Sequence, residues 1–155
     1  NVALFMDSEK NFIKNIIKEV NVDIIQFHGM EKDSFCSQFD KPFIKAVSYQ
    51  NKELLLNLDQ HYPNAYAFIV DSHQEGEMGG TGTTFQEKNL SFSSKKPILV
   101  AGGINSTNVI NVVKTYNPYG IDVSSGVESS KGIKSIKLIK ELVEIIKNEQ
   151  KYTKG

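Results

Sequence analysis

The chain has little of several features that would mark common protein classes. It contains one cysteine, Cys36, which excludes an internal disulfide and favours a reducing, cytoplasmic compartment. Its 18 basic and 18 acidic residues give a formal net charge of zero, which offers no support for a nucleic-acid partner or an acidic membrane surface. No apolar run approaches the roughly 18 residues of a membrane span. The three histidines are scattered, and we expect neither a metal ion nor another cofactor.

What the chain does contain is a series of short apolar runs separated by amphipathic segments. The runs predict strands at 2–6, 22–27, 42–47, 65–70, 97–101 and 120–124. Helical periodicity predicts helices at 8–20, with Ser8 as the N-cap, and at 50–60, 105–115 and 135–148, before a frayed tail at 149–155. Alternating strands and helices indicate a parallel sheet in an α/β fold. The spacing of the strands is near the repeat of a (β/α)8 TIM barrel.

Polar residues gather where the predicted strands end. Gln26 and His28 close the second strand, Asp71 closes the fourth, and Asp122 lies in the last. Catalytic residues of parallel α/β proteins lie at this carboxyl edge of the sheet, so the pattern points to an enzyme. On position alone, however, a strand-end aspartate commonly caps the next loop, and a strand-end histidine is more often structural.

Three loops rich in glycine and other small residues follow the last three strands: "GEMGGTG" at 76–82, "AGGINS" at 101–106 and "SSGVES" at 124–129. Glycine lets an anion approach the backbone, whose N–H groups then bind phosphate oxygens. We therefore expect a phosphate site formed by Gly80, Gly102, Gly103, Ser125 and Gly126. Phosphate in TIM barrels usually lies at the loops after strands 7 and 8. Counting back from there predicts that residues 1–155 are a single barrel domain holding strands 3 to 8, without the N-terminal βαβ portion.

Four segments resemble signature segments of phosphoribosylanthranilate isomerase, an enzyme of tryptophan biosynthesis: "VDIIQFHG", "DSHQEGEMGGTGTTF", "PILVAGGINSTNV" and "GIDVSSGVESSKGIKS". Their order and spacing match as well, and the resemblance covers essentially the whole chain. It implies an Amadori rearrangement of N-(5'-phosphoribosyl)anthranilate to 1-(2-carboxyphenylamino)-1-deoxyribulose 5-phosphate. The expected partner is thus a small phosphoribosyl substrate, and the oligomeric state stays open.

The resemblance also implies roles for single residues. Asp71 matches the general acid that protonates the ribose ring oxygen. His28 lines the substrate site, Gln26 points toward the same rim, and Asp122 has a supporting role. The family's base is a cysteine in a "K-I-C-G" segment, and an arginine binds the anthranilate carboxylate; residues 1–155 contain neither segment. Cys36 is expected to be a small buried hydrophobe rather than the base, so these residues alone are expected to be inactive.

Two other functions remain open at this point. One is another phosphate-binding barrel enzyme of the indole or histidine pathways, against which the "GGTG-x-x-F" pattern after "DS" argues. The other is a non-catalytic phosphate-binding module or an inactive fragment, which the missing strands favour. Substrates of each pathway would separate the first alternative from the isomerase.

Overall fold

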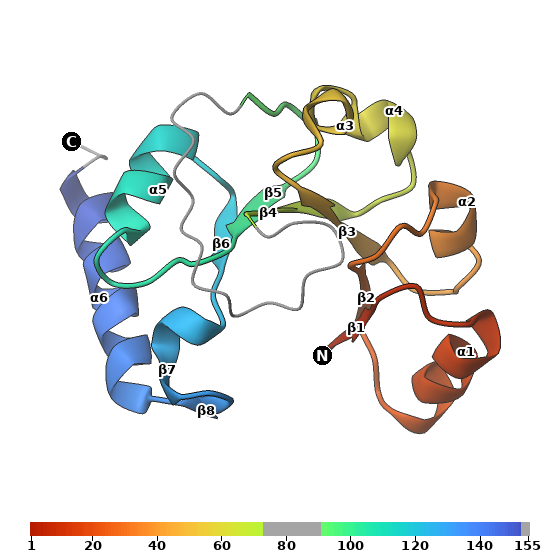
Figure 1. Ribbon diagram of the computed structural model, residues 1–155, viewed down its shortest axis with the longest axis horizontal. Helices are drawn as coiled ribbons and strands as arrows, with labels where there is room; N and C mark the ends of the chain where they lie inside the picture. Colours follow the sequence, from red (N-terminus) through yellow and green to blue (C-terminus); the bar gives the residue numbers. More distant parts are fainter. Residues whose placement is uncertain (73–90, 153–155) are drawn as a thin grey trace.

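A six-stranded parallel sheet forms the centre of the computed structural model, which describes residues 1–72 and 91–152 (Figure 1). The strands follow one another across the sheet in chain order: β1 (Val2–Phe5), β2 (Ile24–Phe27), β3 (Phe43–Ser48), β4 (Ala67–Asp71), β5 (Ile98–Ala101) and β6 (Gly120–Asp122). Each pairs in parallel with the next. The predicted α/β fold with a parallel sheet is confirmed, and all six predicted strands are present.

Helices connect the strands and lie around one side of the sheet (Figure 1). They are α1 (Lys10–Glu19), α2 (Asp33–Cys36), α3 (Lys52–Leu56), α4 (Leu58–His61), α5 (Val109–Tyr116) and α6 (Ile136–Tyr152). A 3-10 turn, η1 (Ser125–Val127), leads into an antiparallel hairpin of β7 (Glu128–Ser130) and β8 (Ile133–Lys134), which the sequence pattern did not predict. Within the described ranges, no helix combines the length and apolar character that crossing a membrane requires.

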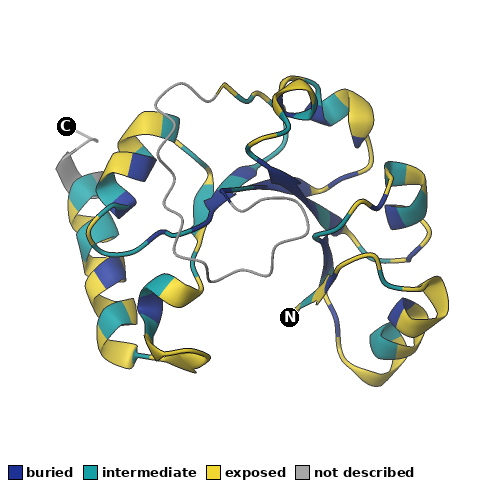
Figure 2. Ribbon diagram, in the orientation of Figure 1, coloured by how far each residue is buried: buried dark blue, intermediate teal, exposed yellow. Residues whose placement is uncertain are grey.

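The two faces of the sheet carry different layers of the core. The helix-facing layer is rich in aromatic rings, and the Phe27 and Phe43 ring centroids lie 5.9 Å apart. The opposite face carries a smaller cluster of Ala46, Ile69 and Ala101. Figure 2 shows the central strands buried between exposed outer surfaces. Since each large apolar side chain contributes about 1.5–3 kcal/mol when fully buried, the helix-facing layer supplies most of the packing free energy.

Several predicted helix limits were wrong, because polar side chains near the ends bond elsewhere. Ser8 is not the N-cap of α1: Glu9 occupies that position without a capping side-chain bond, and Ser8 Oγ donates to Met6 O at 3.5 Å. The helix predicted at 105–115 begins at Val109, because Asn108 Oδ1 accepts from the Asn105 N–H at 2.8 Å in a preceding turn.

The segment predicted as one helix at 50–60 forms α3 and α4 instead. Asn57, with φ −130° and ψ 28°, separates them in a non-helical conformation. At the end of the chain, α6 continues through Tyr152, so the tail predicted to fray from residue 149 is helical for its first part.

Candidate active site

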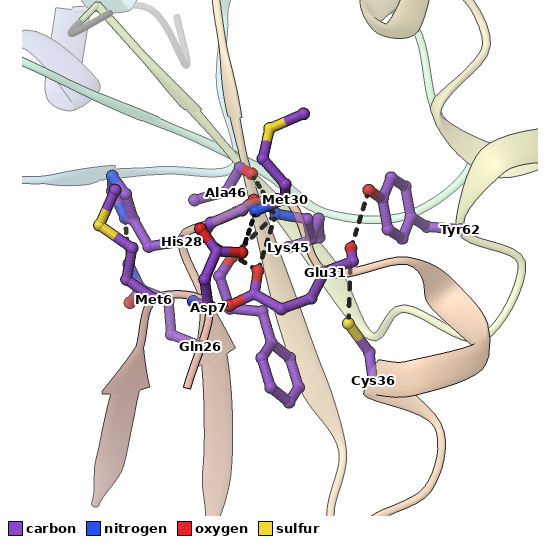
Figure 3. Close-up of polar contacts among 12 residues, drawn as sticks. Met6, Asp7, Gln26, His28, Met30, Glu31, Cys36, Lys45, Ala46 and Tyr62 are labelled. Carbon is purple, nitrogen blue, oxygen red and sulfur yellow. Dashed lines mark hydrogen bonds and ion pairs between the residues drawn. The ribbon is translucent and has the colours of Figure 1, made fainter. Parts of the chain in front are cut away.

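His28 and Asp71 meet at the carboxyl edge of the sheet, across the intervening strand β3. His28 directly follows β2, and its Nε2 atom lies 3.6 Å from Oδ2 of Asp71, the last residue of β4. On the other side of the ring, His28 Nδ1 lies 3.4 Å from Nε2 of Gln26 (Figure 3). The edge therefore brings together an imidazole and a carboxylate, two kinds of side chain that serve as general acids and bases.

Asp122 ends β6 at the same edge and brings a second carboxylate toward the pair. In the strand register, Ala101 of β5 lies between Asp71 and Asp122, which corresponds to about 10 Å between their Cα atoms. Asp122 as a whole residue is exposed to solvent. Its carboxylate is nevertheless partly desolvated by the surrounding protein, and this desolvation raises its pKa. The negative charge of Asp71 raises that pKa further, while His28 and Lys134 oppose the rise.

The loop after β5 uses glycine for its backbone conformation. Gly102 and Gly103 have φ angles of 98° and 59°, in the left-handed region that side chains disfavour. The carbonyl oxygen of Gly103 accepts from Asn108 Nδ2 at 2.9 Å, which fixes the loop to the residue before α5. The two glycines therefore produce a tight bend directly above the strand end.

Glycine also allows close packing at two further places along this edge, between Gly102 and Ser72 and between Gly126 and the loop after β5. A Cβ atom on Gly102 would overlap the side chain of Ser72, which follows β4. A Cβ atom on Gly126 would overlap the backbone oxygen of Ile104 in the loop after β5. Part of the glycine content thus serves close packing between loops, in addition to any contact with a ligand.

The turn η1 after β6 presents backbone donors. Val127 N–H donates to Ser124 O at 3.4 Å, and Glu128 N–H donates to Ser125 O. The N–H groups of Ser125 and Gly126 come before these bonds, at the start of the turn.

Lys134, on β8, is a residue of this region to which the sequence reasoning gave no role. Its ammonium donates to Ser124 O at 3.0 Å, to Ser124 Oγ at 2.9 Å and to Glu128 Oε1 at 2.6 Å. The bond from Lys134 lowers the pKa of Glu128. The available signal was the "KGIKS" end of the last quoted segment, which contains this lysine.

A second group that the sequence reasoning missed lies beneath the loop after β2. Lys45 of β3 and Glu31 are both buried, with Nζ and Oε2 3.6 Å apart (Figure 3). Burial lowers the pKa of Lys45, against the attraction of Glu31, which raises it. A lysine in a strand rich in apolar residues carried no signal by itself, because its acidic partner is 14 positions away in another segment.

The remaining predictions fare differently. Cys36 is buried, and burial raises the pKa of its thiol to about 12, which confirms the expectation of a small buried residue. Gly80, predicted to bind phosphate, lies outside the described residues. In the part of the chain that the structure describes, no group of His, Cys, Asp and Glu side chains is arranged to hold a metal ion. Gln26, His28, Asp71, Asp122 and the loops after β5 and β6 all lie at one edge.

The family model for N-(5'phosphoribosyl)anthranilate (PRA) isomerase matches residues 1–145 of the chain. The chain belongs to this family. An N-(5'-phosphoribosyl)anthranilate isomerase of Neisseria gonorrhoeae is 44% identical over 131 residues, which cover 84% of this chain and 63% of that relative. The chain spans about two thirds of the length of the curated isomerases that it matches. The predicted family resemblance is confirmed.

Solved isomerase structures share the fold. The phosphoribosyl anthranilate isomerase of Thermotoga maritima superposes with a TM-score of 0.77 at 26% identity, covering 95% of this chain and 72% of that one. A further isomerase structure, 24% identical with a TM-score of 0.71, covers 95% and 71% and was solved with reduced 1-(o-carboxyphenylamino)-1-deoxyribulose 5-phosphate. The fold of this chain, with its six-stranded parallel sheet, is therefore similar to that of isomerases that are TIM barrels.

Proposed function

We propose that these residues form the acid-bearing and phosphate-binding part of an N-(5'-phosphoribosyl)anthranilate isomerase of tryptophan biosynthesis. The observation that carries the proposal is the His28–Asp71 pair, 3.6 Å apart at a sheet edge that also bears the glycine loops after β5 and β6. Acid–base side chains beside backbone N–H donors suit a phosphorylated sugar, because the donors can bind the phosphate while an acid protonates the ring oxygen. No cofactor is needed for this rearrangement.

In this proposal Asp71 is the general acid that protonates the ribose ring oxygen. His28 lies beside the same carboxylate and would line the substrate site with it. Gln26 holds the second ring nitrogen of His28 and lines the substrate site with it. Asp122, whose pKa is raised by burial and by Asp71, supports the site as a second carboxyl group at the same edge.

The phosphate is assigned to the loops of the last strands. Backbone N–H groups of Gly102, Gly103, Ser125 and Gly126 would bind its oxygens, together with Gly80 beyond the described residues. Lys134 lies beside Ser124 in the same region, so its positive charge would also favour a dianion here.

We also propose that residues 1–155 form one domain whose six strands correspond to strands 3 to 8 of the family barrel. Two observations support this assignment. The inner face of β1 leaves Val2 55% and Leu4 57% exposed, as expected where a barrel core layer would continue. The curated relatives are also longer than this chain. The proposal assigns no base, because the "K-I-C-G" segment does not occur in residues 1–155. The cytoplasmic location stays a prediction from the cysteine content.

The test uses purified residues 1–155 in two measurements. Calorimetric titration should detect binding of the reduced deoxyribulose 5-phosphate analogue, and weaker binding of a phosphoribosyl compound from the histidine pathway. Fluorescence assay with fresh N-(5'-phosphoribosyl)anthranilate should give no turnover until an N-terminal βαβ piece of a relative is added. Equal binding of both compounds would remove the substrate assignment. Binding without turnover after complementation would favour the non-catalytic module, and turnover by residues 1–155 alone would place the base within them.

A further inference from the structure

Lys45 binds the backbone on both sides of His28. Its ammonium donates to the carbonyl oxygen of Phe27 at 3.3 Å and to that of Gly29 at 2.6 Å, the two residues that flank His28. A third bond reaches Ala46 O at 2.9 Å (Figure 3). Three donors on one ammonium thus have three backbone acceptors, two of which belong to the residues on either side of the histidine.

Glu31 fixes the other polar groups of the same loop. Its carboxylate lies 3.6 Å from Lys45 Nζ and accepts from the N–H of Gly29 at 2.9 Å and of Asp7 at 2.7 Å. Asp7 in turn accepts from the Met30 N–H at 2.7 Å. The loop after β2 is therefore held through its carbonyl groups by a cation and through its N–H groups by two carboxylates.

The ends of this network are tied to the core on the helix side of the sheet. Tyr62, at the end of α4, donates its hydroxyl to Glu31 O at 3.1 Å. The ammonium of Lys45 also lies 5.7 Å from the centre of the Tyr62 ring, where a cation is attracted by the ring face. These contacts anchor the loop that carries His28 to the packed layer on the helix side of the sheet.

Stability alone is a poor reason for burying this pair. Lys45 and Glu31 retain only 2% and 3% of their side-chain exposure. Desolvating two charges offsets most of their attraction, so apolar residues of similar volume would often stabilise a fold as well or better. What apolar residues could not do is bind the carbonyl groups of Phe27 and Gly29.

Lys45 lies on the opposite face of the sheet from the acid–base pair. It alternates along β3 with Ala46, which belongs to the cluster on the face away from the helices, while Phe43 and Val47 join the helix-facing layer. Its influence on His28 must therefore pass through the backbone.

We propose that Lys45 and Glu31 are positioning residues, which hold the backbone around His28 so that its imidazole stays against Asp71. The inference rests on the proposed function for the statement that His28 serves the substrate. The positioning of His28 by Lys45 and Glu31 is measured without substrate. The positioning role and the proposed function can therefore fail independently of each other.

The experiment measures how strongly His28 senses Asp71. In residues 1–155 labelled with ¹⁵N, the ring nitrogen shifts of His28 are recorded with and without the Asp71→Asn substitution. The same comparison is then made in a Lys45→Met background. We expect the response of the His28 ring to Asp71→Asn to fall by about half or more when Lys45 is absent, because coupled neighbours give non-additive effects.

The matched control is Lys96, which makes similar contacts elsewhere. Its ammonium donates to the carbonyl oxygens of Tyr62 and Pro63 at 2.9 and 2.6 Å and lies 5.8 Å from the centre of the Phe68 ring. Lys96→Met should lower stability but leave the His28 response unchanged. If Lys45→Met does not fold, the double variant Lys45→Met/Glu31→Gln removes both buried charges and takes its place. An unchanged His28 response in the folded Lys45 variant, or an equal loss in Lys96→Met, would overturn the proposal.

Discussion

Nε2 of His28 lies 3.6 Å from Oδ2 of Asp71, although the two residues end strands that are separated by β3. Such a contact bridges the sheet edge and requires both residues to point to the same face. Asp71 receives its direction from its place at the end of β4, whereas His28 lies just beyond β2 and depends on its loop. The chemistry of the edge therefore depends on a loop conformation as much as on strand pairing.

Asp71→Asn should abolish turnover in a chain that carries the complete family barrel. The amide cannot protonate the ring oxygen, so kcat should fall by more than the roughly 10²–10⁴ of one proton transfer if ring opening fails. Binding of the reduced analogue should persist in calorimetry. Asp122→Asn, at the same edge, is the control and should lose less activity. Near-normal turnover by the Asp71 variant would show that the acid lies elsewhere.

Gly103→Val should weaken binding of phosphate esters by about tenfold or more if the loop after β5 holds the phosphate. Because Gly103 has φ 59°, valine should also cost about 1–2 kcal/mol of folding free energy. Asn117→Val offers a control with similar strain, because Asn117 has φ 42° at the C-cap of α5 and lies before β6, at the opposite edge of the sheet. Titration of both variants with ribose 5-phosphate separates binding from strain, since only the Gly103 variant should lose affinity.

Cys36 should react with thiol reagents only when the protein unfolds. With a pKa of about 12, the thiolate fraction at pH 8 is on the order of 10⁻⁴, and the side chain is buried as well. Labelling with a chromogenic disulfide should be slow in buffer and rapid in urea. Cys36→Ala should lose about 1–2 kcal/mol of stability from the small cavity. Fast labelling of the folded chain would contradict both the burial and the raised pKa.

Raising the pH toward 10.5, the ordinary pKa of a lysine, should relieve the cost of burying Lys45. Burial lowers its pKa in the folded protein below the ordinary 10.5, so between the two values the unfolded chain binds more protons. The free energy of unfolding then rises with pH across that window. Urea unfolding at a series of pH values should reveal this rise, and Lys45→Met should remove its contribution while Lys96→Met keeps it. Identical pH dependence in the Lys45 variant and the unmodified chain would contradict the assignment.

The strands and the site edge could be predicted because their signals are local. Each apolar run is continuous in sequence, and in a parallel sheet every carboxyl end lies at one edge. That rule is enough to bring Gln26, His28, Asp71 and Asp122 together without any knowledge of loop geometry. Glycine clusters likewise mark tight turns wherever they occur.

The rest depended on contacts between distant segments. The Lys45–Glu31 pair joins a strand to a preceding loop, and neither residue is unusual in its own surroundings. The hairpin of β7 and β8 is too short to produce an alternating pattern. Asn57 interrupts a leucine-rich helix through its own backbone conformation, which periodicity does not register. The position of Ser8 in the sequence suits an N-cap, but its hydroxyl donates to the carbonyl oxygen of Met6 instead.

The order of the sheet has a consequence for how the protein is made. In the six-stranded sheet, each strand from β2 to β6 pairs with the strand synthesised immediately before it. A nascent chain leaving the ribosome can thus add each new strand to an edge that already exists, without waiting for a distant partner. On the side where the sheet grows, the edge exposed at any moment is the one that the next βα unit covers, so growth shortens the time for which that edge is open to other chains.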